Sequence, residues 1–492
     1  MGLITWIADK FGTKTALPAP ARRSFSAAAV SRLTASWTTT NKSADADLRG
    51  GLTVLRARAR DLERNNDYAR RFLDMCIDGI VGDKGVRLQN KALNANGSLD
   101  KSANDKVEAA WSDWGRLGVC EVSGQFDWVM VQALAVRTWK RDGECLVRLR
   151  KDIRNRHRFA LQFIDVDQLD ERYNDQLANG NQIRMGVEID GDGKPVAYHL
   201  HKYHPSDIMT ARSQERVRVP AAEIIHLFTA ERPGQTRGIP RMACGMTTIN
   251  NIGGYVEAAV INARIGASKM GFFTRTNDSG ALPGGETDAN GNFITDADPG
   301  SFDVLPVGYD LKNFDPAYPS NEFDDFMKRN LKGAASGWGV DYHRLASDYT
   351  DASWSSVRQS AADERDNWKS DQQVFITRFV RPIFEAWLSM ALLTQALRLP
   401  VDKYEKLNAP RWQPRRWAWV DPAKEEQART ESYQQRRSSL TRLLSEQGED
   451  IEDLFDEIEA EQKLAQAKGI TLPPLAGSAK EVPPNGTEDT QP

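Results

Sequence analysis

The spacing of apolar residues predicts helices in the first part of the chain. Residues 56–82, RARARDLERNNDYARRFLDMCIDGIVG, fit two helices that break at Asn65-Asn66. An apolar stripe along the second helix comprises Tyr68, Phe72, Cys76 and Ile80. The arginines of the first helix are spaced by two and spread around it, so a solvated helix pair held by salt bridges is favoured over a DNA-binding face. They are Arg56, Arg58 and Arg60.

From residue 144 the apolar period changes to two, which predicts strands. Alternating segments are CLVRLR at 145–150, RFALQFI at 158–164 and EIIHLF at 223–228. Residues 183–203 predict a hairpin that turns at residues 190–193. Its inward side chains would be Ile183, Met185, Val187, Ile189, Val196, Tyr198 and Leu200. We therefore expect an α+β domain over residues 46–240.

After Pro240 the pattern becomes helical again. The stripe of this helix is dominated by small residues: Ile249, Ile252, Val256, Ala259, Ala263 and Ala267. Small side chains let helices approach closely, so this helix should pack among others. Residues 277–302 are polar and rich in turn residues, which predicts an insertion or a projecting module.

The longest helical pattern covers residues 355–397, and Pro382 should kink it. Its apolar stripe comprises Val357, Ala361, Trp368, Phe375, Phe379, Ile383 and Trp387. Further on, Asp421 is a suitable N-cap and Pro422 fits the first position of a helix. Trp412, Trp417 and Trp419 therefore come directly before a helix start.

The two ends of the chain differ from its middle. Residues 1–45 are rich in Ala, Ser and Thr and predict a flexible arm. After Pro422 we expect two acidic helices that are split near Gly448. The last residues, 471–492, predict a disordered tail.

Composition narrows the functional classes. The 492 residues exceed what one core supports and predict roughly two to four compact units. The formal net charge of -3 means that any contact with nucleic acid must be local. The four cysteines lack C-x-x-C spacing, which disfavours a disulfide framework and a cysteine zinc site. No window approaches the ~20 apolar residues of a membrane span, so we expect a soluble protein with no membrane partner.

Motifs of familiar enzyme classes are missing from the sequence. It has no G-x-x-x-x-G-K-[ST], no G-x-S-x-G and no H-E-x-x-H. The best metal candidates are His199, His201 and His204. No carboxylate or cysteine clearly completes a tetrahedral set, so a plain strand facing solvent is favoured. His226 fits a satisfied or edge histidine.

A cluster of acids lies between a strand and a turn: Asp165, Asp167, Asp170 and Glu171. It could form a two-metal nuclease site, because phosphodiester cleavage needs clustered carboxylates. Aspartates also gather in turns for their own hydrogen bonds, and this interpretation is favoured. We predict no catalytic residue, no metal site and no cofactor, and therefore no enzyme.

Four segments, in this order, resemble one protein family. They are residues 56–82 quoted above, VPAAEIIHLFTAERPGQTRGIP at 219–240, WSSVRQSAADERDNWKSDQQVFITRFVRPIFEAWL at 354–388 and WVDPAKEEQARTESY at 419–433. Together they look like the portal proteins of tailed bacteriophages, in the branch typified by phage lambda. The resemblance covers nearly everything from about residue 50 to 470.

The resemblance implies a portal-type α+β subunit in a dodecameric ring at one capsid vertex of the virion, assembled in the host cytoplasm. Double-stranded DNA would pass through the ring into the capsid during packaging and out of it at infection. Expected partners are further copies of the chain, terminase, head-tail connector or adaptor proteins, and the major capsid or scaffold protein. Two alternatives stay open: a virion-associated nuclease, and another neck or capsid subunit.

The family's modules imply a division of the chain. An α/β wing would cover 46–240, and stem and clip 241–330, with the clip near 277–315 and a second stem helix at 323–338. A tunnel loop near 339–353, the long kinked helix and the remaining wing would fill 331–420. A helical crown would cover 421–470.

A channel for DNA should hold few strong phosphate contacts, because each adds affinity that slows translocation. Candidate channel or tunnel-loop cations are Lys328, Arg329, Lys332 and Arg344. The tryptophans before the crown could stack bases, but they adjoin a helix start. A joint between wing and crown, with arginines stacked on indoles, is favoured. Its candidate residues are Trp412, Trp417, Trp419 and Asp421.

Overall fold

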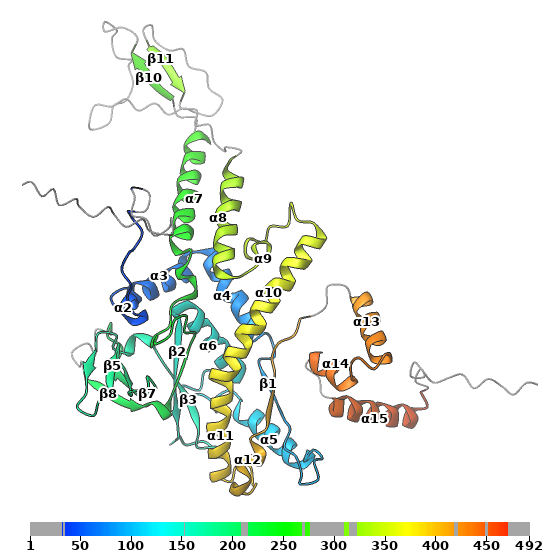
Figure 1. The fold of residues 1–492 in the computed structure, drawn as a ribbon. Coiled ribbons are helices and arrows are strands. Elements are labelled where there is room, and N and C mark those ends of the chain that lie inside the picture. Colours follow the sequence, from blue (N-terminus) through cyan, green and yellow to red (C-terminus); the bar gives the residue numbers. More distant parts are fainter. Residues whose placement is uncertain are drawn as a thin grey trace, which may run out of the picture.

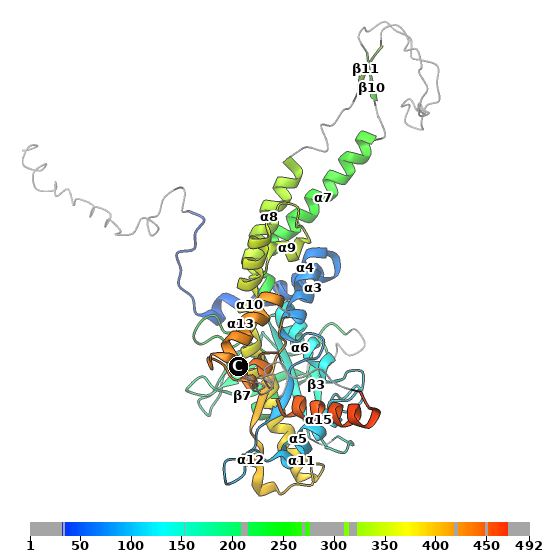
Figure 2. The same ribbon diagram turned by 90° about the vertical axis from the view of Figure 1, so that its right-hand side faces the viewer.

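The computed structural model describes residues 32, 35–151, 153–207, 215–267, 271–275, 309–313, 322–417, 422–447 and 451–470. These residues form a body of helices and sheets, a projecting pair of helices and a C-terminal helical group (Figure 1). The projecting pair extends away from the body in both views (Figure 1, Figure 2). The mixed helix and sheet class predicted from the sequence is confirmed.

The N-terminal helices form where the sequence predicts them. After a short α2 (Ala44–Leu48), α3 (Leu52–Asn65) and α4 (Asp67–Ile80) break at Asn66. Asn66 has an extended backbone, and its side-chain oxygen accepts a hydrogen bond from the Ala69 amide at 3.0 Å, which starts α4. Buried residues of the predicted α4 stripe are Phe72, Cys76 and Ile80.

Two further helices, α5 (Lys101–Trp114) and α6 (Trp128–Asp142), complete this part of the body. The side chains of Asp100 and Asp127 cap their N-termini. A three-stranded antiparallel sheet follows α6 in the chain. Its central strand β2 (Glu144–Arg150) lies between β3 (Ala160–Ile164) and β9 (Ile224–Phe228), as the alternating pattern predicts.

A second antiparallel sheet has five strands in chain order. They are β4 (Asp175–Gln176), β5 (Gln182–Arg184), β6 (Val187–Ile189), β7 (Pro195–His201) and β8 (Arg216–Pro220). The predicted turn between β6 and β7 is confirmed, because the Asp190 amide donates to the Lys194 carbonyl at 3.0 Å. The sheet packs on a second, small apolar cluster that includes Val187, Tyr198 and Leu200, together with Leu146 of β2 in the three-stranded sheet.

The single strand predicted for residues 183–189 is wrong. The chain reverses at Met185 and Gly186, which have positive φ angles of 47° and 84°, so β5 and β6 are two paired strands. Glycine adopts this conformation without steric cost and two positive φ angles suit a tight hairpin turn. Met185 is buried, which is why it imitates an inward strand position in the sequence.

The projecting pair consists of α7 (Met246–Ala267) and α8 (Glu322–Trp338), which confirms the two helices expected on either side of the turn-rich segment. Beyond them β10 (Gly271–Arg275) pairs with β11 (Tyr309–Asn313) (Figure 1). The turn-rich residues 277–302 lie outside the described residues.

The long helix is interrupted before its proline. It consists of α10 (Trp354–Phe375), a π-helical turn (Ile376–Val380) and α11 (Arg381–Leu393). Pro382 has no amide hydrogen and its ring crowds the carbonyl four residues earlier, and a wider turn relieves both problems. The helix ends at Leu393, four residues earlier than predicted.

The chain then returns to its N-terminal part. After the short α12 (Tyr404–Leu407), β12 (Pro410–Gln413) pairs antiparallel with β1 (Arg87–Asn90). Buried residues from 59–161 and from 327–407 form one continuous apolar cluster. The segments predicted as wing and as 331–420 therefore share a core, and the module boundaries remain predictions.

One close approach holds this core together. The α4 backbone at Gly79 lies directly against the Trp368 ring of α10, and an added Cβ would lie 2.5 Å from Trp368 Cδ2. The Gln372 side chain donates to the Gly79 carbonyl at 2.9 Å beside this contact. A larger residue than glycine cannot occupy position 79 without moving α10.

The C-terminal group has three helices, so the prediction of two is wrong. They are α13 (Pro422–Gln434), α14 (Leu440–Gln447) and α15 (Ile451–Lys468). The unexpected break occurs at Arg436, which has a φ of 55°, and Ser439 then caps α14 by accepting from the Arg442 amide at 3.2 Å. α14 ends at Gln447 and α15 begins at Ile451, on either side of the predicted break, while Gly448 itself lies outside the described residues. No helix in the described part of the chain is long and apolar enough to cross a bilayer.

Candidate DNA-facing site

Two of the four candidate cations are tied to carboxylates. Lys328, on α8, places its Nζ 3.0 Å from Asp324 Oδ2 and 2.9 Å from Asp351 Oδ2. Hydrogen bonds to Asp351 and Asp324 raise the pKa of Lys328 well above its ordinary value. The lysine therefore joins α8 to the expected tunnel loop, and its charge is matched within the chain.

The expected tunnel loop is also held from within. It contains α9 (Tyr342–Ala346), and the Tyr342 hydroxyl donates to Asp348 Oδ2 at 2.8 Å. Hydrogen bonds from Thr350 and Tyr342 hold the pKa of Asp348 well below its ordinary value. An ionised carboxylate thus organises the turn that follows α9.

Arg344 connects α9 to the long helix. Its guanidinium bonds to Glu364 of α10, a side chain that is buried. Asp341 caps α9 and also accepts from the Ser360 hydroxyl of α10. Arg344 is therefore committed to an internal ion pair.

The other two candidates, Arg329 and Lys332, are exposed on α8. Lys332 Nζ lies 5.2 Å from the centre of the Tyr342 ring, above the same loop. Two aromatic residues between α9 and the start of α10 are also exposed, Tyr349 by 52% and Trp354 by 69%. Neither aromatic stood out in the sequence, because each occurs among polar residues without a periodic pattern.

The acid cluster at 165–171 is divided between arginines. Arg60 Nη2 lies 2.9 Å from Asp165 Oδ1, and Arg60 Nη1 lies 2.8 Å from Asp167 Oδ2. Arg56 bonds to Asp167 and Glu171, while Asp170 turns away to Arg216. The ligand atoms of Asp165, Asp167 and His204 lie within 4.8 Å of one another, a spacing that could suit a metal ion. A cation there would face the Arg60 guanidinium, so the geometry favours the arginine network over a two-metal site.

The three histidines of the metal candidate have different carboxylate neighbours. His199 Nε2 lies 3.2 Å from Glu188, His201 Nε2 lies 3.6 Å from Asp170, and His204 approaches Asp165 and Asp167. The three therefore do not converge on one point. The prediction that His199 faces solvent is wrong, since it is buried against Tyr173 and Glu188.

His226 is a satisfied histidine on an edge strand, as predicted. Its Nε2 lies 2.8 Å from Glu144 Oε2, and Arg237 binds the same carboxylate through Nε and Nη2. Burial by itself would raise the pKa of Glu144, but the charge of Arg237 and the His226 hydrogen bond hold it well below its ordinary value. Burial lowers the pKa of His226. No local pattern in the sequence indicates this pair, because Glu144 and Arg237 are far apart in the chain.

The tryptophans at the candidate joint pack on the body. Trp412 lies in β12, with ring centroids 5.6 Å from Phe384 and 6.3 Å from Trp111. Trp417 is half-buried against the large apolar cluster. Trp412 therefore contacts aromatic rings of the body. Arg415, in the same segment, donates a hydrogen bond to the Asp78 carbonyl near the end of α4. Trp419 and Asp421 lie outside the described residues.

A family model described as phage portal protein, lambda family, matches residues 30–372. The chain belongs to this family. Among curated relatives of this portal subunit, the probable portal protein of Halomonas phage phiHAP-1 is 34% identical over 480 residues, which cover 96% of this chain and 93% of the relative. Portal protein B of Escherichia phage lambda is 24% identical, covering 91% of this chain and 90% of the relative. The four segments identified in the sequence thus led to the correct family.

Chains in solved structures are similar to this one with TM-scores below 0.5. A chain from the neck of an empty gene transfer agent particle is 13% identical to this portal subunit, with a TM-score of 0.43, and covers 82% of this chain and 97% of the other. A chain from the virion of a native gene transfer agent particle is 12% identical with a TM-score of 0.42, covering 81% and 93%.

Proposed function

We propose that this portal subunit forms a dodecameric ring at one capsid vertex, whose channel passes double-stranded DNA into the capsid during packaging and out of it at infection. The observation that carries the proposal is the family match over residues 30–372, together with full-length similarity to a probable portal protein. The portal family is structural, and the subunit has no catalytic role of its own in this proposal. The arginine network around Asp165 and Asp167 supports that assignment.

The shape of the subunit supports several separate docking surfaces. The hairpin of α7 and α8 carries β10 and β11 away from the body, while α13–α15 lie at its side (Figure 1). A ring of such subunits would present the hairpin tips at one end and keep the bodies together. In this proposal terminase, head-tail connector or adaptor proteins, and the major capsid or scaffold protein bind these surfaces in turn.

The candidate cations have two different roles in the proposal. Arg329 and Lys332 guide DNA, because they are exposed on α8 next to the expected tunnel loop. Lys328 and Arg344 keep that loop in place through Asp351 and Glu364. A few exposed cations attract the duplex without binding it tightly, which suits a channel through which DNA moves.

The tryptophan segment would join the body to the crown, as expected from the sequence. Trp412 and Trp417 supply the packing on the body, and α13 begins five residues after Trp417. A second link between the body and the crown is the ion pair between α5 and α15. Lys101 Nζ lies 2.7 Å from Asp456 Oδ2 in this pair (Figure 2). Trp419 and Asp421 complete the joint in this proposal.

The direct test of this function is packaging. Capsids assembled with the wild-type subunit should protect genomic DNA from nuclease, and capsids assembled without it should not. Subunits carrying Arg329→Glu and Lys332→Glu should still assemble but package DNA more slowly. The matched control is Arg398→Glu with Lys403→Glu, two exposed cations near α12 at the far end of the body from α8. Normal packaging without the subunit would contradict the function, and equal rates in both double variants would contradict only the role of Arg329 and Lys332.

A further inference from the structure

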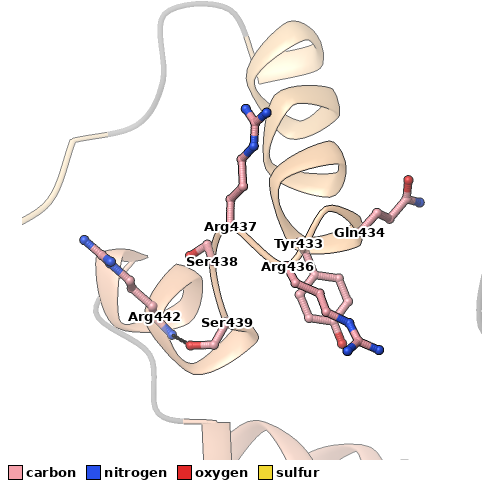
Figure 3. A pocket seen from close by; sticks show the side chains of 7 residues that line it. All are labelled: Tyr433, Gln434, Arg436, Arg437, Ser438, Ser439 and Arg442. Atoms are coloured by element: carbon pink, nitrogen blue, oxygen red, sulfur yellow. Dashed lines mark hydrogen bonds between the residues drawn. The ribbon is translucent and has the colours of Figure 1, made fainter.

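The connection between α13 and α14 is a basic corner. Its hollow of about 590 Å³ is lined by Tyr433, Gln434, Arg436, Arg437, Ser438, Ser439 and Arg442 (Figure 3). Residues 432–445 contain these three arginines and no acid. Arg436 and Arg437 are exposed, and no carboxylate in the described part of the chain forms an ion pair with them. Tyr433 lies beside Arg436 and is 50% exposed, while Arg437 points the other way from the same connection (Figure 3).

An acidic face on α15 has the opposite character. Glu457 and Glu461 are exposed one turn apart, and Leu464, which is 56% exposed, lies on the same side of the helix. Like charges four residues apart destabilise a helix slightly, and an opposite charge outside the helix would relieve this repulsion. Two other acids of α15 have partners within the chain, since Asp456 pairs with Lys101 and Glu459 with Lys463.

The two surfaces are complementary but separate on one subunit. Each has an exposed apolar side chain, Tyr433 or Leu464, flanked by charges of one sign. Leu444 of α14 and Ala465 of α15 are buried, so α15 packs through the side that carries Ala465 and leaves Glu457, Glu461 and Leu464 exposed. Within the described residues, the basic corner and the acidic face form no ion pair with each other.

We propose that the basic corner of one copy docks on the acidic face of the next copy around the ring. This inference rests on the proposed ring. A closed ring of identical subunits uses a heterologous contact, in which two different surfaces of each subunit match. Tyr433 would pack against Leu464, and Arg436 and Arg437 would approach Glu457 and Glu461. Opposite charges at such a rim select the correct partner and register.

DNA phosphate is the competing occupant of the basic corner. It would satisfy the arginines, but it would leave Glu457, Glu461 and Leu464 unexplained. Residues 446–461 also contain nine acids, whose field repels a duplex near the same helical group. A neighbouring copy accounts for both surfaces at once.

The test reverses each surface in the full-length chain. Arg436→Glu with Arg437→Glu, and separately Glu457→Arg with Glu461→Arg, should each raise the subunit concentration needed for ring formation by about tenfold or more. Light scattering and electron microscopy measure assembly. Combining all four changes should restore the ring. Mixing the two variants should also restore it, because every contact in an alternating ring then joins opposite charges. Arg398→Glu with Lys403→Glu is the control and should assemble normally.

Each outcome has one meaning. If wild type forms no ring, the proposed function is contradicted. If wild type forms rings and neither the combined nor the mixed variants recover from the loss, the docking proposal is wrong. If reversal at Arg436 and Arg437 leaves rings intact but weakens binding of a short DNA duplex, DNA occupies the corner instead. Should a reversed chain not fold by circular dichroism, Arg436→Gln with Arg437→Gln gives the same comparison with a milder change.

Discussion

Arg237 Nη2 lies 2.7 Å from Glu144 Oε1, and both side chains are fully buried. The same carboxylate accepts from the Gly238 amide at 3.0 Å, and Arg237 Nη1 donates to the Met185 carbonyl at 2.8 Å. One ion pair thus connects β2 of the small sheet, the turn between β5 and β6, and the segment that leads to α7. This connection orients the five-stranded sheet on the body.

Glu144→Gln should therefore destabilise the subunit by about 3–5 kcal/mol, because it leaves the buried Arg237 charge without a partner. Urea denaturation followed by circular dichroism measures the loss. Glu223→Gln, at a partly exposed carboxylate paired with Arg148 nearby, is the control and should cost far less. Equal losses of unfolding free energy in the two variants would contradict the claim that the buried Glu144 pair stabilises the subunit more than an exposed pair does.

Stability should fall in acid, and Glu188 should contribute to the fall. Hydrogen bonds from Arg218 lower the pKa of Glu188 to about 2, against an ordinary value of 4.5. A carboxyl with a depressed folded-state pKa stabilises fully above its unfolded pKa, and this stability is lost as the pH falls from there through the folded pKa. The urea concentration at the unfolding midpoint should decrease as the pH falls below about 4.5, and Glu188→Gln should reduce this decrease. An unchanged pH dependence of stability in the variant would show that Glu188 does not contribute to the loss of stability in acid.

Gly79→Ala should destabilise the core by about 1–3 kcal/mol, because the new methyl group would overlap Trp368. Thermal unfolding measures this effect. Gly333→Ala on α8 is the matched control, since an added Cβ there meets nothing within 4 Å. The control should leave the subunit as stable or slightly more stable, because alanine favours helix over glycine. A harmless Gly79→Ala would mean that α4 and α10 are less closely packed than described.

Trp417→Ala should weaken folding and ring assembly while leaving DNA association unchanged, because the indole packs on the body. A loss of about 1–3 kcal/mol is expected for a half-buried tryptophan. Trp354→Ala removes an indole that is 69% exposed and should cost little stability. If Trp417→Ala lowered DNA affinity without affecting assembly, base stacking would replace the joint as its role.

Lys328→Gln should loosen the expected tunnel loop, since it removes the charge that bonds to Asp324 and Asp351. Hydrogen exchange at residues 348–353 should become faster, while exchange in α10 stays the same. Wild type should show the same trend at high salt, because the pairs are partly exposed and screened. Unchanged exchange in Lys328→Gln would show that the hydrogen bonds of Asp348 suffice to hold the loop.

Periodic and capping signals predicted most elements correctly. The break at Asn66, the strands β2, β3 and β9, and the helix start at Pro422 all follow from local patterns. The turn at Met185 escaped notice because its side chain is buried like that of a strand residue. Alternation alone does not show where a chain reverses when an apolar residue occupies the turn.

Contacts between distant residues explain what the sequence could not show about the candidate sites. The arginines near 56–60 and the acids at 165–171 were separate patterns in the sequence, yet Arg56 and Arg60 bind those acids. Lys328 and Arg344 read as exposed cations, but their carboxylate partners come from other segments. The sequence shows which charged side chains are available for ion pairs, but only the fold determines which pairs form.

Electron microscopy of the purified subunit in top view, with its mass from light scattering, tests the central claim most directly. The proposed function predicts an annulus with an open centre and the mass of twelve subunits. A compact monomer or dimer at micromolar concentration would contradict it.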